Sequence, residues 1–149
     1  MKRLLYLMFI TVVLFSCTSG KKGELNVQAA YDLIGRVVPE HADNFKVEYV
    51  KPENGNDVFE LESCRGKIVL RGNNGVSVAS ALNHYLENYA HCEYSWNASN
   101  MDIPSPLPMV EGKVRKVTPY RFRHYFNYCT FSYTSPWWDW ERWQKEIDY

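Results

Sequence analysis

Four prolines between residues 97 and 119 divide the chain into two parts of unequal size. Proline fixes φ and has no backbone N–H to donate, so this density of proline excludes a long helix and a central strand. We therefore interpret residues 97–119 as a linker that is extended at most. A hydrophobic core must then come from residues 24–96, and residues 120–149 begin a second unit.

The first unit, residues 24–96, has the pattern of a small α+β domain. Apolar residues recur at helical spacing over residues 27–38, after Asn26 as a candidate N-cap, and again over residues 78–89. Between these helices the apolar residues alternate, and Asn54-Gly55 is a strong turn signal. We therefore expect the order α-β-β-β-α-β, with early strands paired as hairpins in a mostly antiparallel sheet. The expected strands are residues 45–50, 58–62, 67–70 and 92–96.

The second unit, residues 120–149, has the pattern of one strand followed by one helix. Alternation over residues 120–126 predicts the strand, and Ser135-Pro136 predicts the helix start, with Ser at the N-cap and Pro at the first helical position. The helix carries an apolar stripe, which we interpret as packing into a core. Because one strand and one helix cannot bury their own apolar faces, we expect this unit to continue beyond Tyr149. The stripe consists of Trp140, Trp143 and Ile147.

The N-terminus has the pattern of a bacterial export signal. A short basic start precedes an apolar run over residues 4–15, which is too short for a transmembrane helix of about 20 residues. The small residue before Cys17 resembles a lipoprotein cleavage box, which implies acylation of the Cys17 sulfur. Residues 1–16 are then a signal peptide and residues 17–23 a tether, and the protein is expected to be membrane-anchored in the periplasm or on the cell surface. A plain secretory signal without lipid stays open.

The charge balance excludes one class of partner. The chain has 17 basic and 17 acidic residues, and loss of residues 1–16 leaves 15 basic residues against 17 acidic ones. Nucleic-acid binding depends on clustered Lys and Arg, and no basic stripe is visible here. We therefore expect no nucleic-acid partner.

Three cysteines follow Cys17, and their pairing is left open by the sequence. Export permits disulfides, so a Cys64–Cys92 bridge with Cys129 unpaired is one interpretation. Three buried thiols that act as small apolar groups are the other.

Metal and cofactor motifs are not recognised. His84, His91 and Cys92 lack the tight spacing of a zinc site. The stretch Arg71–Gly75 joins a strand to a helix but lacks the Gly-Lys-Ser/Thr ending of a P-loop, so we interpret it as a tight turn. We therefore expect neither a metal nor a cofactor.

The most specific motif starts at Asn127, where the predicted strand ends. It combines an amide, a thiol, hydroxyls and four indoles, which suit a sugar because a sugar offers hydroxyl groups and an apolar face. Asp139 lies among the tryptophans and is a candidate catalytic carboxylate. We favour the other interpretation, in which its negative charge stabilises the first turn of the helix. The motif reads Asn127-x-Cys129-Thr130-x-Ser132-Tyr133, then Trp137-Trp138-Asp139-Trp140-x-Arg142-Trp143-x-x-Glu146-Ile147-Asp148.

This motif resembles the opening of the α-N-acetylglucosaminidase family, glycoside hydrolases that remove terminal α-linked N-acetylglucosamine. Residues 72–86 and 92–96 are similar to that family's small N-terminal domain. The resemblance implies that residues 120–149 are the first strand and helix of an incomplete (β/α)8 barrel. It also implies that Asn127 and Cys129 line the pocket for the terminal sugar.

The same resemblance implies a retaining mechanism with two catalytic glutamates. In the family these lie in later barrel segments, and no position of this chain matches them, so we expect the chain alone to be inactive. The expected partners are a glycan with terminal N-acetylglucosamine and, through the lipid, a membrane. A surface lipoprotein that binds glycans without cleaving them is the alternative.

Overall fold

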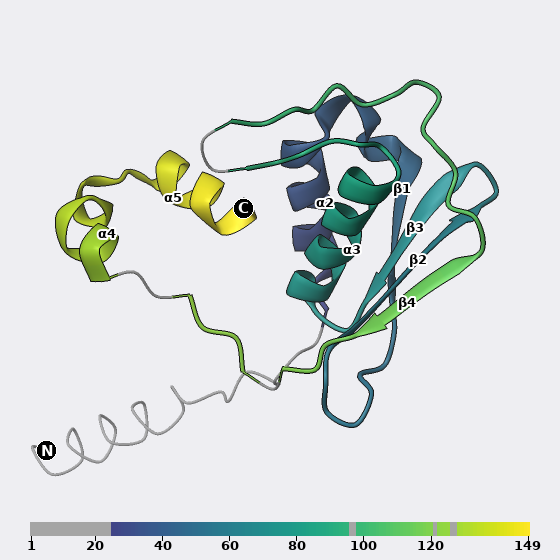
Figure 1. The fold of residues 1–149 in the computed structure, drawn as a ribbon, viewed down its shortest axis with the longest axis horizontal. Coiled ribbons are helices and arrows are strands. Elements are labelled where there is room, and N and C mark those ends of the chain that lie inside the picture. Colours follow the sequence, from purple (N-terminus) through teal and green to yellow (C-terminus); the bar gives the residue numbers. More distant parts are fainter. Residues whose placement is uncertain (1–24, 96–97, 121, 126–127) are drawn as a thin grey trace, which may run out of the picture.

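The computed structural model describes residues 25–95, 98–120, 122–125 and 128–149. Its main body, here called the sheet domain (residues 25–117), is a four-stranded sheet with two helices over one face. Of the C-terminal helices, α4 (Tyr128–Tyr133) lies apart from this domain, and α5 (Trp140–Asp148) ends close to it (Figure 1). In chain order its elements are α2 (Val27–Val37), the 3-10 helix η1 (Pro39–Asn44), β1 (Phe45–Tyr49), β2 (Val58–Cys64), β3 (Lys67–Gly72), α3 (Gly75–Asn88) and β4 (Lys113–Val117).

The sheet has the strand order β1-β3-β2-β4. Strand β3 pairs parallel with β1 and antiparallel with β2, and β2 also pairs antiparallel with β4. The prediction of an α+β domain with a mostly antiparallel sheet is therefore confirmed. Two helices packed on one face of such a sheet bury its inner side chains and leave the other face to solvent.

The expected hairpin between β1 and β2 is wrong, because β3 lies between these strands. The turn signal itself is confirmed: Asn54 and Gly55 have φ values of 52° and 79°, and Glu53 and Asn56 exchange backbone hydrogen bonds around them. The turn closes within the loop and never extends into a ladder. The second turn, at Arg65-Gly66, does join paired strands, β2 and β3.

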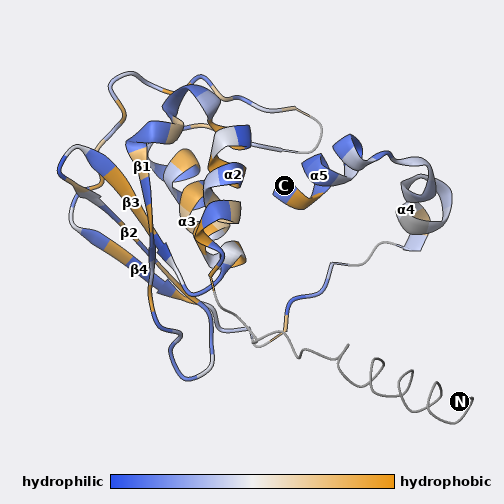
Figure 2. Ribbon diagram, turned by 180° about the vertical axis from the view of Figure 1, so that it is seen from behind, coloured by the Kyte–Doolittle hydropathy of each residue, from blue (hydrophilic) through white to orange (hydrophobic). Residues whose placement is uncertain are grey.

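Both long helices begin at a side-chain cap that the sequence provides. The Asn26 side chain accepts a hydrogen bond from the Ala29 N–H, and the Asn74 side chain accepts one from the Ser77 N–H. The core lies between these helices and the sheet, and Figure 2 shows apolar residues along α2, α3 and the strands. Its largest fully buried side chains are Tyr85, Ile34, Leu61, Ile68, Leu70, Leu86, Val38, Val58 and Val78.

The stretch interpreted as a linker, residues 97–119, contributes to the sheet domain. It contains strand β4, its Val110 is 5% exposed, and Met101, Ile103 and Leu107 pack against the core. The Tyr85 hydroxyl donates to the Pro108 carbonyl oxygen at 2.9 Å, which fastens the proline-rich part to α3. The prolines exclude a helix here, as expected, but three of them lie before β4 and Pro119 lies after it, so none interrupts the strand.

Residues 92–96 were predicted to form a strand, and this is wrong for the part that the structure describes. Residues 92–95 have only an isolated bridge between Glu93 and Asn100. Cys92 is buried and its amide donates to the Leu86 carbonyl oxygen at 2.8 Å, so the segment ends α3 instead of extending the sheet. Its apolar character reflects contact with the core.

The two thiols considered for a disulfide are not bonded to each other. Cys64 is exposed at the end of β2, whereas Cys92 is buried beyond α3. Burial raises the pKa of the Cys92 thiol, which disfavours the reactive thiolate. Cys92 thus serves as a small apolar group of the core.

The predicted signal peptide (residues 1–16), the tether (residues 17–23) and Cys17 lie outside the described residues. Among the helices that are described, none has both the length and the apolar character that a bilayer crossing requires. Export and lipidation therefore stay predictions.

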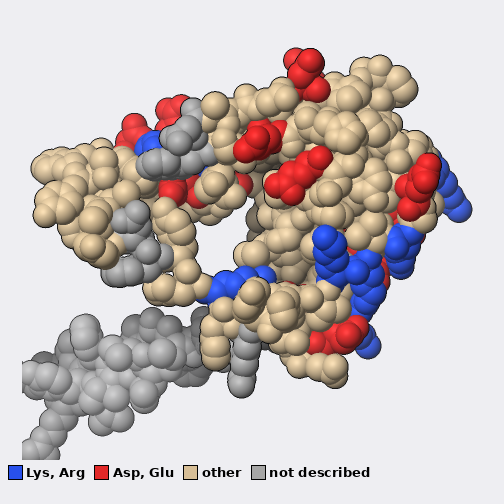
Figure 3. Space-filling view, viewed as in Figure 1, with Lys and Arg blue, Asp and Glu red and all other residues tan. Residues whose placement is uncertain are grey.

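A row of alternating charges crosses the outer face of the sheet. Glu48 and Arg71 are cross-strand neighbours, Arg71 lies opposite Glu60, and Glu60 lies opposite Arg115 on β4. Figure 3 shows basic and acidic side chains gathered over the strands. The Glu60 carboxylate, with its side chain 9% exposed, accepts from Lys113 at 2.8 Å and from Arg115 at 2.5 Å. Opposite charges directly across a sheet stabilise the pairing, so the row favours this register over its alternatives.

Because of the charged row, the free energy of unfolding is expected to fall as the pH becomes acidic. Burial raises the pKa of Glu60, but the hydrogen bonds from Lys113 and Arg115 outweigh burial and leave the pKa below its ordinary value. Hydrogen bonds from Lys46 and Arg71 lower the pKa of Glu48 in the same way. A carboxylate whose pKa is lowered by folding contributes stability above its unfolded pKa of about 4.3, and this contribution is lost as the pH falls through the folded pKa.

We predict that Glu60→Gln lowers the free energy of unfolding by about 1 to 2 kcal/mol at pH 7, because it leaves cations beside a neutral amide. The deficit relative to wild type is expected to shrink as the pH falls through the lowered pKa of Glu60, because the protonated carboxyl no longer pairs with the cations. Glu53→Gln is the matched control: Glu53 also pairs with Arg115 but its side chain is 48% exposed, so a change below about 0.5 kcal/mol is expected. Urea unfolding at pH 7 and pH 3 measures both, and an equal deficit at the two pH values would contradict the argument.

Candidate functional site

The tryptophan-rich motif folds into two short helices and one longer helix. They are α4 (Tyr128–Tyr133), the 3-10 helix η2 (Ser135–Trp137) and α5 (Trp140–Asp148). The prediction of a helix starting at Ser135-Pro136 is partly wrong, since only the 3-10 turn begins there. Helix α5 begins four residues later, after Asp139, whose carboxylate accepts from the Arg142 N–H at 2.8 Å.

The strand predicted over residues 120–126 is not present in its described part. Tyr120 and residues 122–125 have no regular secondary structure. A strand requires a hydrogen-bonded neighbour, and within the described residues no strand pairs with this segment. The side chains of Tyr120 and Phe122 are accordingly 69% and 81% exposed.

The two predicted sugar-binding residues have different outcomes. Cys129 lies in the first turn of α4 and is exposed. Asn127, directly before α4, lies outside the described residues, so its position relative to Cys129 stays a prediction. No cap residue or apolar periodicity marks α4 in the sequence, so this helix was not predicted.

The Trp138 ring is held by contacts with two neighbouring side chains. Its ring meets that of Trp143 in an edge-to-face arrangement with the centroids 5.0 Å apart, and the Arg142 guanidinium carbon lies 4.0 Å from the centroid of the Trp138 ring. Arg142 is itself held by Glu146 at 2.9 Å, one turn along α5. Such aromatic and cation–π contacts fix the orientation of the ring.

The stripe interpreted as core is largely exposed. Trp140 and Ile147 are 69% and 68% exposed, and α5 has no buried residue. Trp137, Tyr133 and Tyr128 are exposed as well, so the motif has several exposed aromatic side chains within a short stretch of sequence. Exposed apolar side chains that gather on a surface are typical of a place where a ligand or another part of a protein binds.

Most of the acidic residues of the motif already have structural contacts. Asp139 caps α5, Glu146 binds Arg142 and accepts from the Tyr125 hydroxyl at 2.9 Å, and Asp148 is bound by Arg36. The hydrogen bond to Glu146 raises the pKa of Tyr125. A glycosidase needs two carboxyl groups facing each other across the sugar, and these carboxylates point to different structural partners instead.

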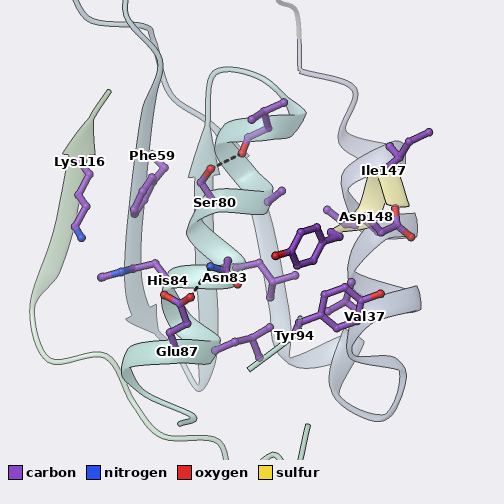
Figure 4. Close-up of a pocket in the computed structure, with 16 residues that line it drawn as sticks. Val37, Phe59, Ser80, Asn83, His84, Glu87, Tyr94, Lys116, Ile147 and Asp148 are labelled. Carbon is purple, nitrogen blue, oxygen red and sulfur yellow. Dashed lines mark hydrogen bonds between the residues drawn. The ribbon is translucent and has the colours of Figure 1, made fainter. Parts of the chain in front are cut away.

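A groove of about 450 Å³ lies between the sheet domain and the end of α5 (Figure 4). Helix α3 supplies Asn83, His84 and Glu87 to it, β4 supplies Lys116, and α5 supplies Asp148. Burial, and then the nearby Lys116, lower the pKa of His84, which favours the neutral imidazole. Its carboxylates are engaged, Glu87 by Asn83 at 3.0 Å and Asp148 by Arg36, so the groove offers no acid–base pair for hydrolysis.

The turn between β3 and α3, considered as a phosphate cradle, is filled by the protein itself. A Cβ on Gly72 would lie 2.7 Å from the Val78 nitrogen, so this glycine permits the close approach of strand and helix. The Asn73 side chain, 5% exposed as a residue, accepts from the Val58 N–H and the Ser77 hydroxyl and donates to Asp57. The interpretation as a tight turn agrees with these contacts.

Comparison with protein families divides the chain at nearly the same place as the structure does. Residues 28–109 match the alpha-N-acetylglucosaminidase (NAGLU) N-terminal domain, and residues 123–149 match the alpha-N-acetylglucosaminidase (NAGLU) tim-barrel domain. The second match falls on the tryptophan-rich motif.

Two relatives show the extent of the similarity. The human alpha-N-acetylglucosaminidase is 35% identical over 147 residues, which are 94% of this chain and 20% of the human protein. The family 89 glycoside hydrolase from Clostridium perfringens, solved with 2-acetamido-1,2-dideoxynojirmycin, is 41% identical with a TM-score of 0.78, over 82% of this chain and 14% of that one. The chain therefore spans about a fifth or less of the length of these relatives. A form of the clostridial enzyme with two Glu→Gln substitutions is solved with its substrate GlcNAc-α-1,4-galactose.

We predict that Asp139 acts as a helix cap. Asp139→Ala is expected to destabilise α5 by about 1 kcal/mol, whereas Asp139→Asn keeps an acceptor for the Arg142 N–H and changes α5 little. Hydrogen exchange of the α5 amides measures both variants. If Asn destabilised α5 as much as Ala, the carboxylate charge and not the cap would be what the helix requires.

Proposed function

The chain belongs to the α-N-acetylglucosaminidase family, and from this membership we propose that it forms the N-terminal domain and the start of the catalytic barrel of an exported glycosidase. The enzyme would hydrolyse terminal α-linked N-acetylglucosamine from glycans. The clostridial relative, whose substrate is GlcNAc-α-1,4-galactose, supports this linkage as the target.

One observation carries the proposal for the sugar site: Cys129 is exposed on α4 and takes no part in the core of the sheet domain. It lies within the residues that match the barrel domain of the family. In a β/α barrel the binding residues follow the strands at the catalytic rim, where loops face the substrate. Asn127 would supply an amide to the sugar hydroxyls and Cys129 a small polarisable side chain to its rim.

We propose that the chain of 149 residues does not cleave glycans by itself. Retaining hydrolysis requires a nucleophile and an acid–base carboxyl about 5 Å apart. Asp139, Glu146 and Asp148 are held in structural contacts with other residues. Asn127 and Cys129 therefore bind substrate in this proposal, and the catalytic glutamates belong to other parts of the family's barrel.

A surface lipoprotein that binds glycans without cleaving them is the second candidate function. The exposed aromatic side chains of α4 and α5 favour it, because indole and phenol rings stack on the apolar faces of sugars. Both functions require glycan binding, but only the glycosidase also cleaves the glycan. An assay that measures binding and cleavage therefore distinguishes them.

We propose a membrane anchor at Cys17, after removal of residues 1–16, with residues 17–23 as the tether. The described helices include none that is suited to crossing a bilayer. A lipidated cysteine would anchor the sheet domain to a bacterial membrane, in the periplasm or on the cell surface.

The protein expressed from its gene is expected to release p-nitrophenol from the α-N-acetylglucosaminide and not from the β-anomer. Asn127→Ala and Cys129→Ala are each expected to raise KM about tenfold, the loss of roughly 1.4 kcal/mol of binding. Cys64→Ala removes an exposed thiol of the sheet domain and is expected to leave KM unchanged.

The 149-residue chain assayed alone is expected to release no p-nitrophenol. Binding of N-acetylglucosamine by the gene product without release from either anomer would support the non-catalytic alternative. Unchanged KM in both Asn127→Ala and Cys129→Ala would remove these residues from the site.

Lipidation is tested by growing bacteria that express the protein with radiolabelled palmitate. Label is expected in the membrane fraction for the wild type and to be lost in Cys17→Ala, because the acylated sulfur is absent. Cys64→Ala again serves as the control and is expected to keep the label. A wild-type protein that is exported without label would establish a plain secretory signal.

A further inference from the structure

Within the described residues, two ion pairs connect the C-terminal segment to the sheet domain, one before the tryptophan-rich motif and one at its end. Arg123 binds Asp57 before the motif, and Asp148, the last residue of the motif, binds Arg36. The described residues between these two pairs, 124–125 and 128–147, are here called the aromatic loop, and they are attached to the sheet domain at both ends. Figure 1 shows this path: α4 lies far from α2 and α3, and the C-terminus turns back toward them.

The pair between Arg36 and Asp148 has the geometry of a specific contact. The Arg36 Nε and Nη2 atoms donate to the two carboxylate oxygens of Asp148 at 2.6 and 2.7 Å, and the Asp148 side chain is only 8% exposed. A bidentate guanidinium–carboxylate pair fixes orientation as well as distance. Asp148 is also the last residue of α5, where the helix dipole disfavours a negative charge, so the position needs a cationic partner.

The Asp57 carboxylate that binds Arg123 is itself held by the buried residue Asn73. Asp57 precedes β2, and its carboxylate accepts from the Asn73 side-chain amide at 2.8 Å. Asn73 is in turn fixed by the Val58 N–H at 2.8 Å and the Ser77 hydroxyl at 3.0 Å. The acceptor for Arg123 is thus held on both β2 and α3 and cannot follow the loop if the loop moves.

A third contact closes the base of the aromatic loop. The Tyr125 hydroxyl donates to Glu146 at 2.9 Å, and these residues lie two positions inside Arg123 and Asp148 respectively. Glu146 also binds Arg142, which lies against Trp138. The base contacts therefore continue into the ring arrangement of the motif.

Apolar packing contributes little to this attachment. Helix α5 has no buried residue, and the exposed large apolar residues Trp140 and Ile147 belong to it. An element that buries so little apolar surface depends on its polar contacts for position. Among the described contacts, the two ion pairs join the loop to the sheet domain by charged side chains.

We propose that Arg36, Asp57, Arg123 and Asp148 are positioning residues that clamp the aromatic loop, and with it Cys129, at a fixed place on the sheet domain. The sheet domain thereby holds in position the loop that carries the proposed sugar-binding residues of the barrel. The sugar-binding part of this inference rests on the proposed function. The clamp itself is a property of the described contacts.

Hydrogen exchange of the 149-residue chain tests the clamp without any sugar. Arg36→Gln is expected to speed exchange of the α5 amides about tenfold and to leave the amides of α3 unchanged, which shows that the sheet domain remains folded. Asp57→Asn keeps an acceptor for Asn73 but removes the charge that binds Arg123, and is expected to speed exchange over residues 122–125. Unchanged exchange in both variants would overturn the proposal.

Matched variants separate the clamp from a general effect of charge. Arg65→Gln removes an exposed arginine at the β2–β3 turn and is expected to leave α5 exchange as in the wild type. The exchanged pair Arg36→Asp with Asp148→Arg is expected to restore slow exchange, and Arg36→Lys to restore it partly, because lysine cannot form the bidentate contact. No restoration by the exchanged pair would contradict a direct contact between these positions.

The link to sugar binding is tested in the protein expressed from its gene. Arg36→Gln is expected to raise KM for the α-N-acetylglucosaminide at least threefold with kcat changed less than twofold, since a displaced loop weakens binding without removing a catalytic group. A loss of kcat at constant KM would contradict a positioning role. If the protein has no such activity, the proposed function fails while the exchange result still decides whether the clamp exists.

Discussion

The sheet domain and the attachment of the C-terminal segment both depend on the hydrogen bonds of the Asn73 side chain. Its oxygen accepts from the backbone of β2 and from the Ser77 hydroxyl of α3, and its nitrogen donates to Asp57. Burying an amide costs free energy unless its polar atoms are hydrogen-bonded. Here Val58 of β2, Ser77 of α3 and Asp57 supply the partners. The same residue therefore sets how α3 lies on the sheet and where the C-terminal segment is attached.

The elements with local signals were predictable from the sequence. Helices α2 and α3 carry their caps at Asn26 and Asn74 and their apolar periodicity over several turns. Apolar and charged residues alternate in β1 and in most of β2, and β3 is a short apolar run. Strand β4 was missed because its sequence, Lys-Val-Arg-Lys-Val, is mostly charged. Lys113 and Arg115 of β4 both bind Glu60 of β2, and an ion pair across strands cannot be recognised from the sequence until the strands are paired.

The errors in pairing and in the C-terminal segment have the same physical origin. The turn at Asn54-Gly55 is real, but sequence proximity favoured a β1–β2 hairpin, whereas β3 gains a partner on each side by lying between them. Alternation over residues 120–126 predicts a strand only where a neighbour is available to pair with it. Of the site, the exposed Cys129 and the motif around it were recognised by resemblance, while the contacts of Arg36 and Arg123 depend on residues far away in the sequence.

Attachment through ion pairs has a consequence for the aromatic loop that attachment through apolar packing would not have. If α5 were fixed by burying Trp140 and Ile147 against α2 or α3, those side chains would be consumed in the contact. Because Asp148 and Arg123 carry the attachment, the aromatic faces stay available while the backbone that bears them is held. Binding to a surface that is already held costs less ordering than binding to a mobile segment. In the proposed function, the charged residues at the base of the loop would hold the backbone, and the aromatic side chains would stay free to meet a sugar.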